Sequence, residues 1–425
     1  MKHPRLFHSV TLQIVFLILS FLSVSLFVTA EEGTSSHFRV IHSFTGGKDG
    51  AYPYAGLVID RAGDLFGTAN QGGILNSQCA PGNTGCGTVF EITGGNSIPS
   101  FRVLYEFRGG RDGQGPYGRV AIGSEGELLG TTVGGGNTSC PGGCGAVFSL
   151  RPSAICNRCE WSESLLYRFL GGDDAYYPTG DLAFDQAGNI YGTTYLGLQA
   201  GTVYELKPKN GGWSESVLYN FSGQEGTGAN PYSGVILDRP GNIYGTTLSG
   251  GINNGGTVFE LAHSKSGWSL NTIFAFENGN NGESPMAGLL WEESSILIGA
   301  TEAGGRGGGG TVYQLTPSQN GWNMDTLYDI PGPGGDPGPW AKLTRDAAGD
   351  LYGTTQGYPP AGDYGTVFKL IHSGGGWKEV VLHRFSGTDG EVPYGTLVLD
   401  AKGNIYGTTN LGGKYGVGVV FEVTP

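Results

Sequence analysis

The chain contains the stretch Pro231-Tyr-Ser-Gly-Val-Ile-Leu-Asp238-Arg-Pro-Gly241-Asn-Ile-Tyr-Gly-Thr-Thr247, and close versions of this phrase occur seven times. The seven copies open at Pro53, Pro116, Pro178, Pro231, Pro285, Pro339 and Pro393. The position numbers of successive prolines differ by 63, 62, 53, 54, 54 and 54. A period of this size indicates a solenoid or a propeller.

Each repeat is predicted to form four short strands. In the repeat that opens at Pro231 they cover residues 234–238, 243–247, 257–261 and 271–276. The tight turn at 239–242 requires antiparallel neighbours, whereas the strands of a β-solenoid pair in parallel. No window after residue 30 shows a sustained helical period. The sequence therefore predicts an all-β fold, a seven-bladed β-propeller of four-stranded blades.

The two ends of the repeat array complement each other. The last repeat stops after its third strand, at 419–423, and a fourth-strand phrase without a repeat of its own lies at 39–44. We expect residues 39–44 to complete the blade that opens at Pro393, because this would cover an open strand edge. Residues 31–425 would then form a single propeller domain.

Residues 1–30 have the layout of a secretory signal peptide. Lys2 and Arg5 precede an apolar run from about Val10 to Val28, and Val28-Thr29-Ala30 offers a cleavage site. An uncleaved membrane anchor is the alternative, since the run is long enough to span a bilayer. No second apolar span follows. We expect a secreted or periplasmic protein with no other membrane contact.

The chain beyond Ala30 is acidic. It keeps 22 basic residues (24 minus Lys2 and Arg5) against 37 acidic ones, a balance of −15. Such a surface argues against nucleic acid and anionic membranes as partners.

The six cysteines form three close pairs, which are Cys79/Cys86, Cys140/Cys144 and Cys156/Cys159. An even number in an exported chain predicts disulfides. A zinc site built from the last two pairs is disfavoured, because the strand between them spans roughly 20 Å and separates them. A redox role for the third pair stays open.

The loops from fourth to first strand and from second to third strand share one face, the loop face. The residues after the repeat prolines lie there, and they are Tyr54, Tyr117, Thr179, Tyr232, Met286, Trp340 and Tyr394. The five aromatic residues are expected to form a ring near the channel, suited to stacking on a sugar or gripping a peptide. The alternative is that they pack on one another and close the channel mouth.

The loop face also carries one acidic residue in six of the blades. They are Asp49, Asp112, Asp174, Glu225, Asp336 and Asp389, with Asn281 in the remaining blade. Carboxylates that faced one another would attract calcium or a cationic ligand. Asp-Gly pairs are also ordinary turn residues, which is the other interpretation. At the opposite turns, Asp60, Asp185, Asp238, Asp346 and Asp400 are expected to cap the hairpins.

No catalytic residue is predicted. The histidines beyond residue 30 are His37, His42, His263, His372 and His383, and none lies in a nucleophile or metal motif. We therefore expect a binding or scaffold module, a monomer without a cofactor, whose ligand is a carbohydrate or a peptide. A polysaccharide lyase or hydrolase that uses loop-face carboxylates is the rival hypothesis, and a purely structural surface protein is a third.

The phrases at 188–194, 241–247 and 403–409 (Gly-Asn-Ile-Tyr-Gly-Thr-Thr) and at 256–261 (Gly-Thr-Val-Phe-Glu-Leu) resemble the GloVer tandem-repeat family. This resemblance covers residues 39–425 and implies an exported bacterial protein. Many members carry a C-terminal surface anchor. This chain stops at Pro425 after its last strand, so secretion or periplasmic retention is expected instead. The family implies no defined activity, so no functional residue is carried over. The hairpin turn also resembles that of NHL and lactonase-type propellers, but the chain has no set matching the lactonases' metal-binding carboxylates and histidines.

Overall fold

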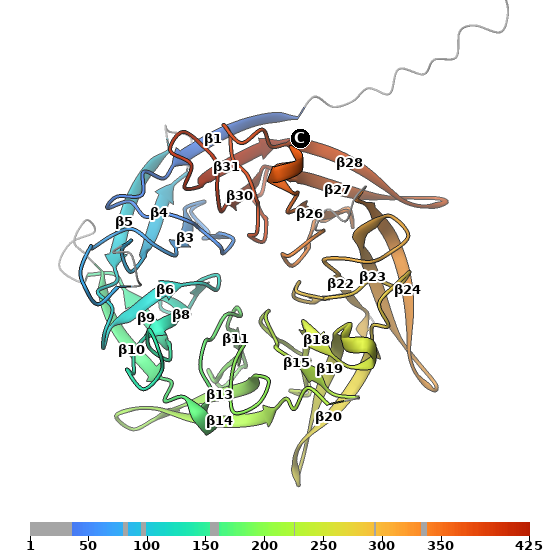
Figure 1. Cartoon of the computed structure of the whole chain (residues 1–425), viewed down its shortest axis with the longest axis horizontal. Coiled ribbons are helices and arrows are strands. Elements are labelled where there is room, and N and C mark those ends of the chain that lie inside the picture. Colours follow the sequence, from blue (N-terminus) through green and yellow to red (C-terminus); the bar gives the residue numbers. More distant parts are fainter. Residues whose placement is uncertain are drawn as a thin grey trace, which may run out of the picture. The chain divides into compact units, whose positions relative to one another are not determined.

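Each repeat folds into one antiparallel sheet of four strands, and the seven sheets surround a common axis (Figure 1). The computed structural model describes residues 36–79, 84–94, 99–153, 161–224, 226–292, 295–332 and 338–425. The predicted signal peptide lies outside these residues. The all-β, seven-bladed β-propeller predicted from the repeat is confirmed.

The four strands of a blade differ in length and in distance from the axis. The innermost strands are β2 (Val58–Ile59), β7 (Ala121–Ile122), β11 (Ala183–Phe184), β16 (Ile236–Leu237), β21 (Leu290–Trp291), β25 (Thr344–Arg345) and β29 (Val398–Leu399). The second strands are β3 (Leu65–Ala69), β8 (Leu128–Gly135), β12 (Ile190–Thr194), β17 (Ile243–Thr247), β22 (Leu297–Ala300), β26 (Leu351–Thr355) and β30 (Ile405–Thr409). The third strands are β4 (Thr88–Thr93), β9 (Ala146–Arg151), β13 (Thr202–Lys209), β19 (Thr257–Ser264), β23 (Gly308–Ser318), β27 (Thr366–Ser373) and β31 (Val419–Thr424). The outermost strands are β5 (Ser100–Glu106), β10 (Ser162–Arg168), β14 (Gly212–Asn220), β20 (Gly267–Ala275), β24 (Gly321–Pro331), β28 (Gly376–Arg384) and β1 (His37–Ser43).

A few short elements lie in the loops. They are the strands β6 (Gly113–Pro116), β15 (Gly228–Ala229) and β18 (Ser249–Gly250), and the single 3₁₀ turns η1 (Gly172–Asp174), η2 (Ile252–Asn254) and η4 (Pro359–Ala361).

The ring closes between the two ends of the described chain. β1 pairs antiparallel with β31, from His37 opposite Thr424 to Ser43 opposite Val419. Phe44, which follows β1, is fully buried and packs with Phe90 of the first blade and Val420 of the last. The expected completion of the last blade by residues 39–44 is therefore confirmed, and the bonded strand begins at His37.

The innermost strands are shorter than predicted. In the repeat that opens at Pro231, only Ile236 and Leu237 pair with the second strand, whereas 234–238 was expected to form a strand. Gly234 lies against the backbone of the preceding blade instead, so close that a Cβ atom there would be 2.3 Å from the carbonyl oxygen of Asp181. The backbone near the axis thus contacts the neighbouring blade.

The Tyr-Gly-Thr-Thr phrase supplies a buried second strand in each blade. In β17 every residue is buried, and the Phe259 ring from β19 lies on Gly245. A Cβ atom at Gly245 would be 2.6 Å from Cζ of that ring. Glycine is required here because the aromatic ring occupies the space of a side chain.

The Asp-x-x-Gly turns are capped by their first residue. Asp400 Oδ1 accepts hydrogen bonds from the backbone N–H groups of Lys402 (2.8 Å) and Asn404 (2.9 Å). Its Oδ2 accepts from Asn404 Nδ2 (2.8 Å) and from the Tyr406 hydroxyl (3.2 Å). The same backbone bonds recur at Asp60, Asp185 and Asp346, as expected for hairpin caps.

Two of the three cysteine pairs form disulfides in the structure. Cys79 bonds to Cys86, and Cys140 bonds to Cys144. Cys156 and Cys159 lie outside the described residues. In the described ranges, no helix has the length and apolar character needed to cross a membrane.

Candidate functional site

The residues after the repeat prolines meet at the axis. All seven side chains, one from each blade, line a cavity of about 440 Å³. The five aromatic side chains among them form an unbroken cycle of ring contacts. The centroid distances are 4.6 Å for Tyr54–Tyr117, 5.8 Å for Tyr117–Tyr232, 6.2 Å for Tyr232–Trp340, 4.4 Å for Trp340–Tyr394 and 5.6 Å for Tyr394–Tyr54.

This aromatic ring is tightly packed. The hydroxyl groups of Tyr117 and Tyr232 contact each other. Burial, and to a smaller extent the nearby Tyr232 hydroxyl, raises the pKa of Tyr117 well above its ordinary value of 10. Thr179 is buried and donates a hydrogen bond to the Tyr232 carbonyl oxygen (2.8 Å). The rings therefore pack on one another, as one interpretation of the sequence expected. Their contact with a ligand stays a prediction.

A polar arc borders the aromatic ring on three neighbouring blades. It consists of Glu302, Gln356 and Asn410, each the first residue after the Thr that ends the second-strand phrase. Gln356 Nε2 donates a hydrogen bond to the Tyr394 hydroxyl (3.2 Å), and the Asn410 amide neighbours Tyr54. Gln356 Oε1 and Asn410 Nδ2 are buried without a hydrogen-bond partner in the described part of the chain.

Glu302 adds a carboxyl group to this arc. Burial raises its pKa, and the nearby Trp340 indole lowers it by less. The indole Nε1 faces this carboxyl group without reaching hydrogen-bond geometry, and it has no other partner among the described residues. The polar arc was not predicted from the sequence. It could have been found from the repeat, because the position after the second-strand phrase holds a polar residue in these three consecutive blades.

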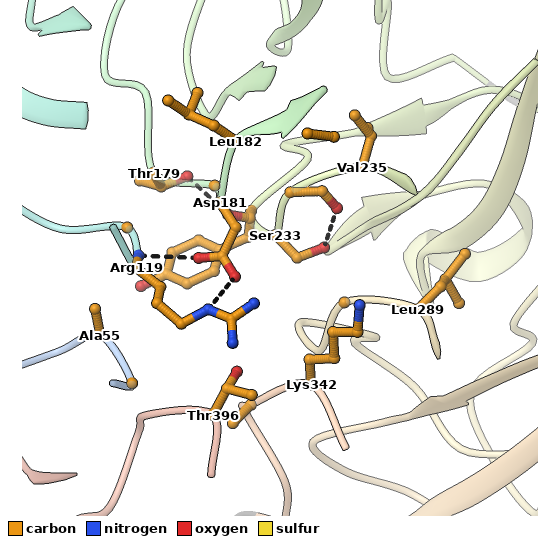
Figure 2. A pocket seen from close by; sticks show the side chains of 18 of the residues that line it. Ala55, Arg119, Thr179, Asp181, Leu182, Ser233, Val235, Leu289, Lys342 and Thr396 are labelled. Atoms are coloured by element: carbon orange, nitrogen blue, oxygen red, sulfur yellow. Dashed lines mark hydrogen bonds and ion pairs between the residues drawn. The ribbon is translucent and has the colours of Figure 1, made fainter. Parts of the chain in front are cut away.

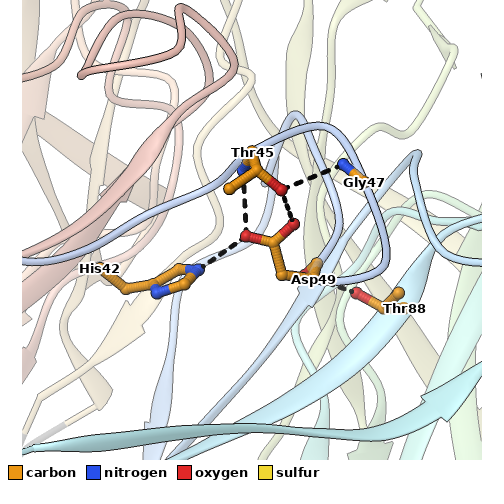
Figure 3. A network of polar contacts seen from close by, with 5 residues as sticks. All are labelled: His42, Thr45, Gly47, Asp49 and Thr88. Carbon is orange, nitrogen blue, oxygen red and sulfur yellow. Dashed lines mark hydrogen bonds and ion pairs between the residues drawn. The ribbon is translucent and has the colours of Figure 1, made fainter.

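The loop-face carboxylates lie in their own turns. Asp49 accepts hydrogen bonds from the Thr45 backbone N–H (2.9 Å) and interacts with His42 Nε2 (3.1 Å), as Figure 3 shows. Asp389 does the same with Ser386 (2.8 Å) and His383 (3.0 Å). None of the described carboxylates of this series lines the axial cavity.

Tyrosine replaces histidine in the equivalent turns of two other blades. Asp112 accepts hydrogen bonds from the Tyr105 hydroxyl (3.0 Å) and the Arg108 backbone N–H (2.9 Å). Asp174 accepts from the Tyr167 hydroxyl (2.6 Å) and from the Leu170 backbone N–H (2.5 Å). These contacts are those of turn residues.

The remaining members of the series are Glu225, Asp336 and Asn281. Glu225 and Asp336 lie outside the described residues. Asn281, in the blade without an acidic residue, accepts a hydrogen bond through its backbone carbonyl oxygen from Thr311 Oγ1 (3.2 Å). Across the described ranges, no three His, Cys, Asp or Glu side chains come together in a group that could hold a metal ion. Calcium binding stays a prediction.

The axial cavity continues beyond the aromatic ring to a charged layer. Arg119, Asp181 and Lys342, each three residues after a repeat proline, line it together with Ser233 and Thr396 (Figure 2). The cavity also reaches Phe184 and Trp291, at the ends of innermost strands near the hairpin turns. It therefore combines aromatic, hydroxyl and charged groups.

The repeat phrases that build this site match a family of known proteins. The model of the Gloeobacter/Verrucomicrobia repeat matches residues 26–199, 138–337 and 292–425. The chain belongs to this family. The resemblance expected from the sequence is thus confirmed, and Gloeobacter/Verrucomicrobia repeats account for all seven blades.

The chain also has a distant similarity to a solved structure. No curated protein matches the sequence. A crystal structure of a protein provisionally assigned as a 6-phosphogluconolactonase, from Bacteroides uniformis, is similar with a TM-score of 0.47 and 13% sequence identity. The similarity covers 76% of this chain and 84% of that one.

Proposed function

We propose that this protein is an exported β-propeller module that binds a carbohydrate at the aromatic ring. The observation that carries the proposal is the closed cycle of Tyr54, Tyr117, Tyr232, Trp340 and Tyr394 next to polar groups without partners among the described residues. Sugars present apolar C–H faces and many hydroxyl groups, and this pairing of aromatic faces with amide groups suits both.

The hydrogen-bonding groups favour a sugar over a peptide. Gln356 Oε1 is an acceptor and Asn410 Nδ2 a donor, and each lacks a partner among the described residues. A buried polar group without a partner costs about 1–3 kcal/mol, and a ligand hydroxyl that met either group after a rotation of its side chain would recover this energy. A peptide would instead pair its backbone with an open strand edge, and the outermost strands that offer such edges lie at the rim of the propeller, away from the aromatic ring.

Export is part of the proposal. Residues 1–30 have the layout of a signal peptide, and the two disulfides fit an oxidising compartment. The rival hypothesis, a polysaccharide lyase or hydrolase that uses loop-face carboxylates, has no comparable support. The described members of that series are engaged in their own turns.

A glycan-array screen of the purified protein, run with calcium and with a chelator, tests the proposal. We expect a hit whose affinity falls at least tenfold in Tyr394→Ala and in Gln356→Ala. Tyr415→Ala is the matched control, because Tyr415 is 49% exposed and lies outside the ring. Binding that all three variants retain would overturn the proposed site. Binding lost only with the chelator would move the site to the carboxylates.

A further inference from the structure

The charged layer of the axial cavity is the part that the proposed function does not use. The residues three positions after the repeat prolines are Gly56, Arg119, Asp181, Gly234, Gly288, Lys342 and Thr396, and all seven line the cavity. Three of them are charged, two positively and one negatively. The described lining of the cavity contains no other charged residue, so it is cationic in a chain with a net charge of −13.

Asp181 holds Arg119 in place. Arg119 Nε lies 3.3 Å from Asp181 Oδ2, and the Arg119 backbone N–H donates a hydrogen bond to Oδ1 (2.9 Å). Both oxygens of the carboxylate are therefore engaged by the same arginine. Figure 2 shows the two terminal nitrogens of the guanidinium group directed away from Asp181 into the cavity. These two nitrogens have no bond to any other described residue.

Lys342 lies across the cavity from Arg119 (Figure 2). Among the residues that the structure describes, its ammonium group has neither a hydrogen bond nor an ion pair. Burial lowers the pKa of Lys342, and the positive charge of Arg119 lowers it further, while Asp181 opposes this. An enclosed cation without a counter-ion is unfavourable, and an anion between the two side chains would remove the penalty.

We propose that the ligand of this propeller is an acidic sugar, with its carboxylate between Arg119 and Lys342 and its ring against the aromatic residues. The planar guanidinium end suits a carboxylate, which accepts two parallel hydrogen bonds from it, and the lysine adds a second charge. Thr396 Oγ1 has no hydrogen bond within the described part of the chain and lines the same cavity. The volume of about 440 Å³ suits a sugar of one or two rings.

The ligand would enter from the hairpin-turn end. Phe184, which lines the cavity near the turns, is 39% exposed. A ligand entering there would meet the charged layer before the aromatic ring.

This inference rests on the proposed carbohydrate function, so its test separates the two. The probes are digalacturonate and its dimethyl ester, which has the same two sugar rings but carries neutral methyl esters in place of the two carboxylates. We expect titration calorimetry to show digalacturonate binding that weakens at least tenfold in the ester, in Lys342→Met and in Arg119→Gln. Lys402→Met is the control, because Lys402 is exposed on a hairpin turn outside the cavity.

Every outcome decides between the proposals. Equal binding of digalacturonate and its ester, lost in Tyr394→Ala, would overturn the acidic ligand and keep the sugar site. Equal binding of acetate and digalacturonate, retained in Tyr394→Ala, would keep the anion site and overturn the carbohydrate function. Absence of digalacturonate binding, or unchanged binding in a Lys342→Met protein with a wild-type melting curve, would overturn the acidic-sugar proposal.

Discussion

The ring of Phe38 stacks on the ring of His383, with 3.6 Å between the centroids and 5° between the planes. Phe38 lies on β1, and His383 lies on β28, the outermost strand of the sixth blade. The first described strand therefore contacts both the last blade, through its pairing with β31, and the blade before it. The ends of the array are held by side chains as well as by backbone hydrogen bonds.

Because Phe44 takes part in this closure, we expect Phe44→Ala to lower the stability of the protein strongly. Phe44 is fully buried and packs edge-on against Phe90, with 5.3 Å between the ring centroids. Truncation leaves a cavity between the first and last blades, so chemical denaturation should show that the free energy of unfolding falls by about 3–5 kcal/mol. Leu75→Ala, at a residue 59% exposed, should change stability by less than about 0.5 kcal/mol. Deletion of residues 31–45 with an unchanged melting temperature would contradict the closure.

The hairpin cap Asp400 predicts a loss of stability in Asp400→Ala. Two backbone N–H groups, the Asn404 amide and the Tyr406 hydroxyl would lose their acceptor, which should cost about 1–3 kcal/mol. Burial alone would raise the pKa of Asp400, but these hydrogen bonds lower it overall. The stabilisation is therefore present above the unfolded-state pKa of about 4 and lost as the pH falls through the lower folded-state value.

The measurement is urea denaturation at neutral pH and in acid. The difference in the free energy of unfolding between wild type and Asp400→Ala should shrink as the pH falls below about 4, where Asp400 of the unfolded chain binds a proton. Asp173→Ala is the matched control, since Asp173 is exposed on η1. A difference that stays constant down to pH 2 would show that the carboxylate charge does not contribute.

We expect the substitution Ala175→Gly to stabilise the protein. Its backbone has φ 66° and ψ 176°, a region that is essentially restricted to glycine. Glycine occupies the equivalent position in several other blades, and three of these glycines, Gly50, Gly282 and Gly390, have positive φ. Ala175→Gly should therefore raise the free energy of unfolding by about 1 kcal/mol.

The reverse change is the control for this prediction. A Cβ atom at Gly282 would be 2.2 Å from Thr301 Oγ1, so Gly282→Ala should destabilise the protein by at least about 1 kcal/mol. Thermal denaturation of both variants checks the pair. A lower melting temperature for Ala175→Gly would show that the buried methyl group outweighs the backbone strain.

The blades could be predicted from the sequence because the residues that form each strand and turn recur in several repeats. Asp238 and Gly245, for example, recur at fixed offsets, and such positions report their own local contacts. The shortness of the innermost strands could not be predicted, because it depends on how Gly234 meets Asp181 of the neighbouring blade. That contact is set by the angle between blades and not by the periodicity within one.

Only those residues of the candidate site that recur at the same repeat position in most blades could be predicted from the sequence. The aromatic ring lies at one repeat position, so its convergence could be inferred from Tyr54 and its equivalents. Arg119 and Lys342 are the only cations at their repeat position, and they belong to the second and the sixth repeat. Their opposition across the cavity depends on the number of blades between them and on side-chain direction, neither of which a local pattern encodes.

The contact between the second and third blades depends on pH. Glu215, on β14, faces Asp174 of the preceding blade, and burial, then the charge of Asp174 and a hydrogen bond to it, raise the pKa of Glu215 to about 8. The folded-state pKa lies above the ordinary value of 4.5, so the contribution to stability is complete below pH 4.5. It is lost as the pH rises through about 8, because two carboxylates then face each other.

We therefore expect the melting temperature to fall between pH 5 and pH 9, and this slope to become shallower in Glu215→Gln, which remains neutral. Glu163 contributes less to this pH dependence of the melting temperature. Its pKa is raised to about 7 by burial and by the charge of Asp112. Glu379→Gln is the matched control, because Glu379 occupies the same repeat position but accepts a hydrogen bond from the Tyr328 hydroxyl (3.2 Å). It should keep the wild-type slope. Equal slopes for wild type and Glu215→Gln would show that Glu215 is ionised in the folded protein throughout this range.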